Sequence, residues 1–193
     1  PLMNTPNFFE LAFLALTGYD PFPWQKRLYQ SFLSGNIPSS CSLPTALGKT
    51  SVIAVWLITI SKLCAEGITK FPRRLVYIVN RRTVVDQATD DVEKYRLALL
   101  RADHPSEQQK VIDSIRNALL SCSVLQDPQL PFAISALRGE LADNHEWSQD
   151  ITRPAIIIGT IEKVGSKLFF LGHGDSIKKR PLHAAFIGQD TLI

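Results

Sequence analysis

Residues 43–50 constrain the fold of this chain most strongly, because they read Leu-Pro-Thr-Ala-Leu-Gly-Lys-Thr and a strongly apolar run follows them. A strand, a tight loop that ends in Gly-Lys-Thr and a helix together make a phosphate cradle, where backbone N–H groups point at a β-phosphate. In such a cradle the Lys49 ammonium neutralises the β and γ charges, and the Thr50 hydroxyl binds Mg²⁺. Lys49 and Thr50 are therefore the candidate catalytic residues, and Thr50 is the candidate metal ligand. The predicted nucleotide contacts in this loop are Pro44, Thr45, Ala46, Leu47, Gly48, Lys49 and Thr50.

The loop departs from the full phosphate-loop pattern. That pattern requires glycine five positions before Gly48, where this chain has Leu43. Ala46 cannot adopt a positive φ as easily as glycine, so the loop needs a negative φ there or accepts strain. A chance Gly-Lys-Thr at the start of a helix is the alternative. A strand before the loop and a buried helix after it favour the nucleotide site.

Apolar periodicity predicts strands that alternate with helices. The predicted strands cover residues 40–43, 74–79, 132–137 and 155–158, and another can begin at residue 191. The predicted helices cover residues 7–17, 24–34, 49–65, 83–100, 105–121 and 160–170. Asn7 is expected to cap the first helix, and Gly18, Gly35 and Gly67 are expected to end the first three. This alternation predicts an α/β fold with a mostly parallel sheet that helices cover on both faces.

Composition bounds the class of protein. Hydrophobic residues at 45% and charged residues at 20% describe a folded globular chain. A net charge of +3 is compatible with a polyanionic partner but does not identify one. Residues 52–60, the longest apolar run, are fewer than the roughly 20 that a membrane span requires, and no secretory leader pattern opens the chain. The three cysteines lack metal or redox spacing, so we expect reduced thiols in a cytoplasmic protein.

Polar and glycine-containing segments follow the predicted strands, at the edge where parallel sheets bind ligands. They are Asn80-Arg81-Arg82, Arg138-Gly139 and Gly159-Thr160, and the phosphate loop is predicted to converge with them at this edge. Arginine suits phosphate oxygens, glycine lets a nucleic-acid backbone approach, and a threonine hydroxyl can cap a helix or donate to a phosphate. A solvated basic pair and an ordinary helix cap are the alternatives. The basic run Lys178-Lys179-Arg180 is expected to be merely solvated.

Several strings together resemble the first RecA-like motor domain of superfamily 2 helicases of the DEAD/DEAH type. Besides the phosphate loop, they are Phe22-Pro23-Trp24-Gln25, Asn80-Arg81-Arg82-Thr83-Val84-Val85-Asp86-Gln87, Ala136-Leu137-Arg138-Gly139 and Ile158-Gly159-Thr160-Ile161-Glu162. That family usually has glycine where Ala46 stands. The string that begins at Asn80 also resembles the helicase part of the CRISPR-associated helicase-nuclease of type I (I-U or I-G) systems. The resemblance covers most of the chain from Phe22 onward.

The resemblance implies a RecA-like P-loop NTPase fold in residues 37–193, with a helical insertion at about 100–130 and a helical lead-in over residues 1–36. It implies ATP and Mg²⁺ as cofactors, and single-stranded DNA and a CRISPR RNA-guided surveillance complex as partners. Gln25 would read adenine, whose edge suits an amide donor and acceptor, with Phe22 or Trp24 over the base. A surface glutamine beside a core Trp24 is the alternative. The implied nucleic-acid contacts are Asn80, Arg81, Arg82, Gln87, Arg138, Gly139, Gly159 and Thr160.

The same family places an Asp-Glu box shortly after the Gly-Thr motif. Residues 188–193 resemble the approach to that box, but Asp190 has no adjacent glutamate and is not assigned its role. We expect the box, the second motor domain with its arginine finger and any nuclease to lie outside this chain. Phosphoryl transfer needs these charges together, so we expect weak ATP·Mg²⁺ binding and negligible hydrolysis. An incomplete sheet is also expected to make the chain poorly soluble by itself.

Two other function classes stay open. A P-loop phosphotransferase for small substrates would need a lid and acid–base residues close behind the phosphate loop, and no convincing set is present. A non-catalytic piece would serve as a docking module.

Overall fold

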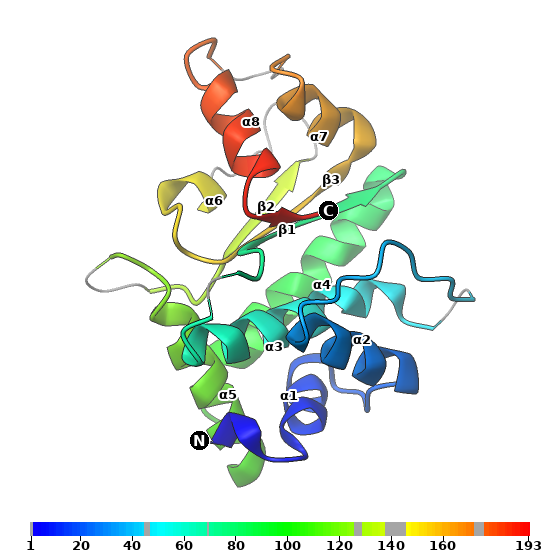
Figure 1. Ribbon diagram of the computed structural model, residues 1–193, viewed down its shortest axis with the longest axis vertical. Coiled ribbons are helices and arrows are strands. Elements are labelled where there is room, and N and C mark those ends of the chain that lie inside the picture. The colour runs from blue at the N-terminus through cyan, green and yellow to red at the C-terminus, as the bar shows by residue number, and fades with distance from the viewer. Residues whose placement is uncertain (1, 45–46, 69, 126–128, 138–145, 172–175) are drawn as a thin grey trace. The chain divides into compact units, whose positions relative to one another are not determined.

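The computed structural model describes residues 2–44, 47–68, 70–125, 129–137, 146–171 and 176–193 (Figure 1). Contacts within the chain define two compact units. The first comprises Pro1–Phe71 and Lys94–Ser121, and the second comprises Pro72–Glu93 and Cys122–Ile193. Helix α4 (Arg82–Leu100) therefore begins in the second unit and ends in the first. The predicted lead-in and most of the predicted insertion fall within the first unit.

Helix α3 (Val52–Ala65) is the core of the first unit, because its apolar side chains surround the helix. Every residue from 53 to 60 is buried, and Trp56 is fully enclosed. This helix packs against α1 (Phe8–Thr17), α2 (Pro23–Leu33) and α5 (Ser106–Leu120) (Figure 1). A 3₁₀ turn, η2 (Lys49–Ser51), precedes it, so the helix predicted over residues 49–65 is confirmed. No helix in the described part of the chain is long and apolar enough to cross a membrane.

The ends of these helices follow the predicted glycines but not the predicted cap. Left-handed glycines stand at the three predicted ends: Gly18, Gly35 and Gly67. Asn7 does stand at the N-cap position of α1, but its φ of −97° and ψ of 7° are not extended and its side chain makes no capping hydrogen bond. The turn η1 (Leu2–Asn4) precedes it, and the Phe8 N–H donates to the Thr5 carbonyl over 3.1 Å.

A parallel sheet forms the centre of the second unit. Its strands among the described residues run in the order β2-β3-β1-β4, all parallel. They are β1 (Arg74–Val79), β2 (Ala133–Leu137), β3 (Ala155–Thr160) and β4 (Thr191–Leu192). Every residue of β2 and β3 is buried, as is typical of apolar strands in parallel sheets. The predicted α/β class is confirmed, whereas coverage of both sheet faces by helices stays a prediction.

Helices α7 (Ile161–Leu168) and α8 (Arg180–Gly188) lie side by side on one face of this sheet (Figure 1). Alternate strand residues such as Val76 and Ile157 point to this face, where they pack with Val164 of α7 and Ile187 of α8. A short helix, α6 (Glu146–Gln149), contacts β2 and β3. The sequence did not predict α8, although Pro181 near its start is a signal for a helix N-terminus.

The strand predicted over residues 40–43 is wrong. Residues 36–44 form neither helix nor strand, and Cys41 and Ser42 are exposed. So short and polar a segment buries little apolar surface, and only pairing with a neighbouring strand could hold it extended. The described sheet pairs none of these residues. The phosphate loop therefore does not follow a strand.

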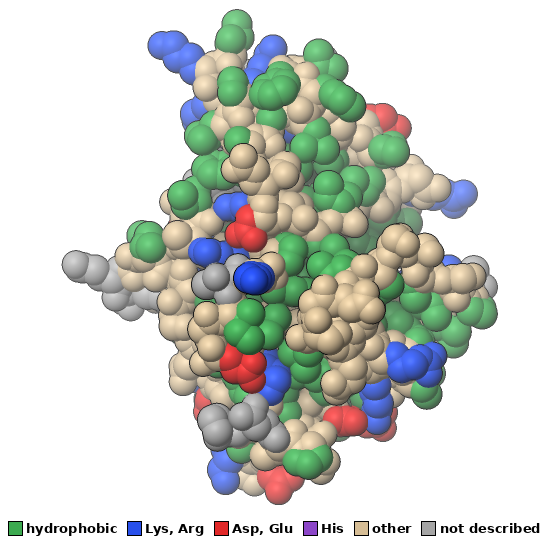
Figure 2. All heavy atoms as spheres, viewed as in Figure 1, with side chains coloured by type: hydrophobic (Ala, Val, Ile, Leu, Met, Phe, Trp, Pro, Cys, Tyr) green, Lys and Arg blue, Asp and Glu red, His purple; other side chains and the backbone are tan. Residues whose placement is uncertain are grey.

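Apolar side chains are exposed where α7 and α8 form the outer surface of the second unit. Figure 2 shows hydrophobic side chains gathered over these helices, near lysine and arginine side chains. Phe169 is 76% exposed and Ile177 is 79% exposed. Apolar surface of this kind favours self-association.

Candidate nucleotide and nucleic-acid sites

The predicted phosphate loop ends in a tight turn at the start of α3. Gly48 has a φ of +65°, a left-handed conformation that glycine adopts without strain. The Ser51 N–H and the Ser51 hydroxyl both donate to the Gly48 carbonyl, over 3.0 and 2.5 Å. Lys49 is exposed and Thr50 is half-buried. A phosphate in solution can therefore reach the Lys49 ammonium at the beginning of a helix, where anions are stabilised.

Two side chains of α2 hold this turn, although they lie more than twenty residues before it. The Trp24 indole N–H donates to the Leu47 carbonyl over 3.2 Å, and Gln25 Nε2 donates to Ser51 Oγ over 2.5 Å. Gln25 Oε1 accepts the Phe22 N–H over 2.6 Å, so the glutamine side chain caps the first N–H at the start of α2. The string at residues 22–25 and the Gly48–Ser51 turn therefore form one hydrogen-bonded site in the first unit.

The same contacts restrict what Gln25 can do. Its side chain is only 2% exposed, and both ends of the amide already have a partner. An amide nitrogen carries two hydrogens and an amide oxygen has two lone pairs, so each end retains capacity for a second bond. The adenine-reading role of Gln25 stays a prediction. The neighbouring Phe22 ring is 46% exposed and is free to lie over a base, whereas Trp24 is buried.

In the second unit, the structure brings two of the predicted nucleic-acid segments to one edge of the sheet. Val79 ends β1, Thr160 ends β3, and the two residues are partners in the strand register. Asn80, Arg81 and Arg82 follow β1 directly, and all three are exposed, as is Gln87 in α4. The predicted convergence is confirmed for these two segments, but it is wrong for the phosphate loop, which was predicted to lie at the same edge and follows no strand of the described sheet. Four predicted site residues lie outside the described part of the chain: Thr45, Ala46, Arg138 and Gly139.

Gly159 and Thr160 have structural roles at this edge. A Cβ atom on Gly159 would lie 3.0 Å from Leu137 Cβ and 3.1 Å from Val164 Cγ2, so close packing of β2, β3 and α7 requires glycine there. Thr160 is the N-cap residue of α7, but its side chain makes no capping hydrogen bond and is only 5% exposed. The helix-cap alternative is therefore not shown for this hydroxyl, and a contact between Thr160 and a phosphate stays a prediction.

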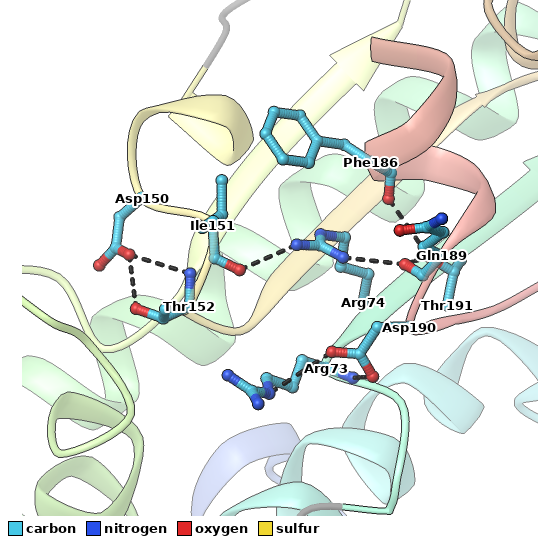
Figure 3. Close-up of polar contacts among 9 residues, drawn as sticks. All are labelled: Arg73, Arg74, Asp150, Ile151, Thr152, Phe186, Gln189, Asp190 and Thr191. Carbon is cyan, nitrogen blue, oxygen red and sulfur yellow. Dashed lines mark hydrogen bonds and ion pairs between the residues drawn. The ribbon is translucent and has the colours of Figure 1, made fainter. Parts of the chain in front are cut away.

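Sequence reasoning missed a buried arginine at the opposite edge of the sheet. Arg74 is 6% exposed; its Nη1 donates to the Gln189 carbonyl and its Nη2 to the Ile151 carbonyl, each over 2.8 Å (Figure 3). Its Cζ lies 5.4 Å from the centre of the Phe186 ring. Burial lowers the pKa of the Arg74 guanidinium, and the nearby Asp190 carboxylate opposes this. Arg74 therefore joins β1 to the segments that lead into β3 and β4.

A signal for this role was present in the strand pattern. Arg74 has the same parity as Val76 and Ile78, which point to the packed face of the sheet. An arginine at such a position is expected to be buried and to need carbonyl or carboxylate partners.

Two acidic side chains near β2 and β3 accept hydrogen bonds from backbone N–H groups and hydroxyls of the second unit. Asp150 accepts hydrogen bonds from the Ser123 hydroxyl and from the N–H and hydroxyl of Thr152. Burial by itself would raise the pKa of the Asp150 carboxyl, but these bonds outweigh burial and hold that pKa below its ordinary value. Glu146 Oε2 accepts the Ile134 N–H over 2.8 Å. Among the described residues, no group of three or more His, Cys, Asp or Glu side chains could hold a metal ion, and the Thr50 role with Mg²⁺ stays a prediction.

No protein-family model matches this chain, and no curated protein or solved structure matches it. The resemblance to superfamily 2 helicases therefore depends on the quoted strings and on the geometry of the residues in them.

Proposed function

We propose that this chain is the N-terminal part of an ATP-dependent helicase or translocase that acts on single-stranded DNA in CRISPR interference. In this proposal residues 37–193 belong to a RecA-like P-loop domain of a cytoplasmic protein, which departs from that family in having no strand directly before the phosphate loop. ATP and Mg²⁺ are its cofactors, and an RNA-guided surveillance complex recruits it.

The observation that carries this proposal is the hydrogen-bonded link between α2 and the Gly48–Ser51 turn. A nucleotide presents a flat base and a charged phosphate tail, so its site needs an aromatic or amide group near a cation. Phe22 and Gln25 supply the first kind of group, and Lys49 supplies the second. Two hydrogen bonds tie the elements that carry them together, from Trp24 to the Leu47 carbonyl and from Gln25 to Ser51, and all of these residues belong to the first unit.

In the proposed site, each group has a separate task. Lys49 would contact the β- and γ-phosphates through its ammonium, and the Thr50 hydroxyl would hold Mg²⁺, which neutralises phosphate charge when bound. Hydrolysis also needs a carboxylate pair and an arginine finger in place. Those groups are not assigned in this chain, so the proposal is binding of ATP without appreciable turnover by the chain alone.

Lys49→Ala is expected to weaken binding of ATP·Mg²⁺ by about tenfold or more, because hydrogen bonds to charged groups contribute about 1.5–3 kcal/mol. Calorimetric titration of the chain measures this change. Lys70→Ala, which removes another exposed lysine of the first unit, is the matched control and is expected to bind as the original chain does. No uptake of adenine nucleotide, or equal affinity in Lys49→Ala, would overturn the proposed nucleotide site.

Measurement of phosphate release from ATP distinguishes the proposed function from a phosphotransferase and from a docking module. We expect no ATP turnover above background, and turnover that Lys49→Ala abolishes would contradict this expectation. A phosphorylated small-molecule product would instead favour a phosphotransferase. The absence of any nucleotide binding would favour a docking module.

The double substitution of Arg81 and Arg82 by alanine is expected to weaken binding of labelled single-stranded DNA to a similar degree for different base sequences. Each phosphate contact on a single strand contributes a slope of about −0.7 to the plot of log K against log salt, so the slope is expected to become shallower by about 1.4. Fluorescence anisotropy over a salt series measures both quantities. Lys178 and Lys179 are an exposed basic pair outside the proposed site. Their double substitution by alanine is expected to change neither the affinity for DNA nor the salt slope. Equal losses in both double variants would contradict a specific role for the first pair.

A further inference from the structure

Trp24 makes a contact that neither of the roles suggested by its sequence explains. Only 9% of this residue is exposed, so its ring is not free to lie over a base as the Phe22 ring is. A buried indole N–H needs an acceptor. Here the acceptor is the Leu47 carbonyl, 3.2 Å away in the phosphate loop and 23 residues along the chain. Trp24 is therefore a core residue with a direct hold on the backbone of the loop.

This contact fixes the direction of the next backbone N–H. The peptide bond between Leu47 and Gly48 is trans, and the C=O and N–H groups of one planar trans unit point in opposite directions. Trp24 holds the Leu47 carbonyl toward α2, so the Gly48 N–H points away from α2. Gly48 is exposed, and a ligand in solution can approach it.

The following peptide unit is held in a similar way by Ser51. The Gly48 carbonyl accepts hydrogen bonds from the Ser51 N–H and hydroxyl, which directs the Lys49 N–H away from Ser51. Gly48 is left-handed, with a φ of 65° and a ψ of 43°, and a 3₁₀ turn follows it. Successive N–H groups in turns of this kind form a concave site for anions. Among the described residues, the N–H groups of Gly48 and Lys49 have no acceptor.

The orientation of the first N–H has to come from outside the loop. Glycine reaches more backbone conformations than any other residue, so Gly48 does not by itself restrict the peptide unit before it. Ser51 holds the carbonyl on the other side of Gly48 and leaves the Leu47 carbonyl to Trp24. A donor that is oriented before the ligand arrives costs less entropy to order during binding. Loss of the indole N–H is therefore expected to weaken the binding of phosphate.

We propose that Trp24 is a positioning residue of the phosphate loop, whose indole N–H directs the Gly48 N–H toward a bound phosphate. This inference rests on the proposed nucleotide site. It adds a residue that controls affinity for the phosphate tail without contact to the base or to the phosphates. The effect is therefore the same for pyrophosphate as for ATP.

Trp24→Phe tests this role, because it keeps an aromatic ring in the core and removes the N–H donor. Calorimetric titration is expected to show affinities for pyrophosphate and for ATP·Mg²⁺ that are both about three- to tenfold lower, the equivalent of one neutral hydrogen bond. Tyr29→Phe removes a polar atom from another buried ring of α2 and is expected to bind as the original chain does. Unchanged affinities in Trp24→Phe, or a loss for ATP with none for pyrophosphate, would overturn the proposal.

NMR of the labelled chain distinguishes positioning from a general loss of stability. Saturating pyrophosphate is expected to move the Gly48 amide signal to lower field in the original chain, and to move it less in Trp24→Phe. An equal movement in both would show that Trp24 does not orient this N–H, even if urea unfolding finds the variant less stable. Weaker binding in Lys49→Ala with unchanged binding in Trp24→Phe would leave the nucleotide site in place and overturn this inference alone. No binding of pyrophosphate or ATP by the original chain would overturn both.

Discussion

Arg74→Ala is expected to lower the free energy of unfolding of the second unit by about 2–4 kcal/mol. Two hydrogen bonds from a charged donor are lost, each worth about 1.5–3 kcal/mol. The guanidinium also leaves the Phe186 ring. Part of the loss is offset, because burying the charge was itself unfavourable and because water can reach the carbonyls of the exposed residues Ile151 and Gln189.

The neighbouring arginine supplies a matched control for this substitution. Arg73 Nε lies 3.4 Å from Asp190 Oδ2, and both side chains are more than one-third exposed. Pairs of this kind contribute at most about 1 kcal/mol, so Arg73→Ala is expected to cost less than that. Urea unfolding, together with amide hydrogen exchange in β3 and β4, measures the two losses. If the two substitutions cost the same, Arg74 is not the residue that joins these strands.

Gly159→Ala is expected to destabilise the second unit by about 1–3 kcal/mol, the usual cost of extra volume in a packed core. The added methyl group would lie 3.0 Å from Leu137 Cβ and 3.1 Å from Val164 Cγ2. The contact with Leu137 Cβ cannot be relieved by rotating a side chain, so the strands or α7 must shift. The midpoint of urea unfolding measures this cost.

Gly165→Ala tests the same chemical change where space is available. A Cβ atom on Gly165, within α7, would meet nothing within 4 Å. Alanine is favoured over glycine inside a helix by roughly 0.5–1 kcal/mol, so this variant is expected to be more stable than the original. Stability changes of the same sign in both variants would contradict the packing argument. A Gly159→Ala variant that keeps its stability but loses DNA binding would show that glycine is needed there for nucleic acid alone.

Local sequence pattern was sufficient to predict the helices and strands whose residues are apolar throughout. The strand predicted over residues 74–79 coincides with β1, and the helix predicted over residues 49–65 matches η2 with α3. In both segments the apolar residues leave no exposed face, and such runs are stable only inside a fold. The convergence of residues 80–82 with Gly159 and Thr160 followed from the same reasoning, because parallel strands end at one edge.

The errors occur where distant partners decide the structure. A strand at residues 40–43 would need a neighbour to pair with, and no local pattern supplies one. Strand alternation could have indicated that Arg74 is buried, but it could not identify the partners, which are carbonyls at Ile151 and Gln189 that lie 77 and 115 residues away. Likewise, the hydrogen bond between Gln25 and Ser51 spans 26 residues, so the sequence alone could not show that this amide is occupied.

The hydrogen bonds from Gln25 to Ser51 and from Ser51 to the Gly48 carbonyl have a consequence for ligand affinity. In the proposed nucleotide site, the Gln25 amide that would recognise a base is also hydrogen-bonded, through Ser51, to the turn that would bind the phosphates. If a base takes the place of Ser51 as the acceptor for Gln25 Nε2, the Ser51 hydroxyl loses that donor. In such an arrangement the affinity for the base and the affinity for the phosphates are coupled. A substitution at Ser51 should therefore alter both.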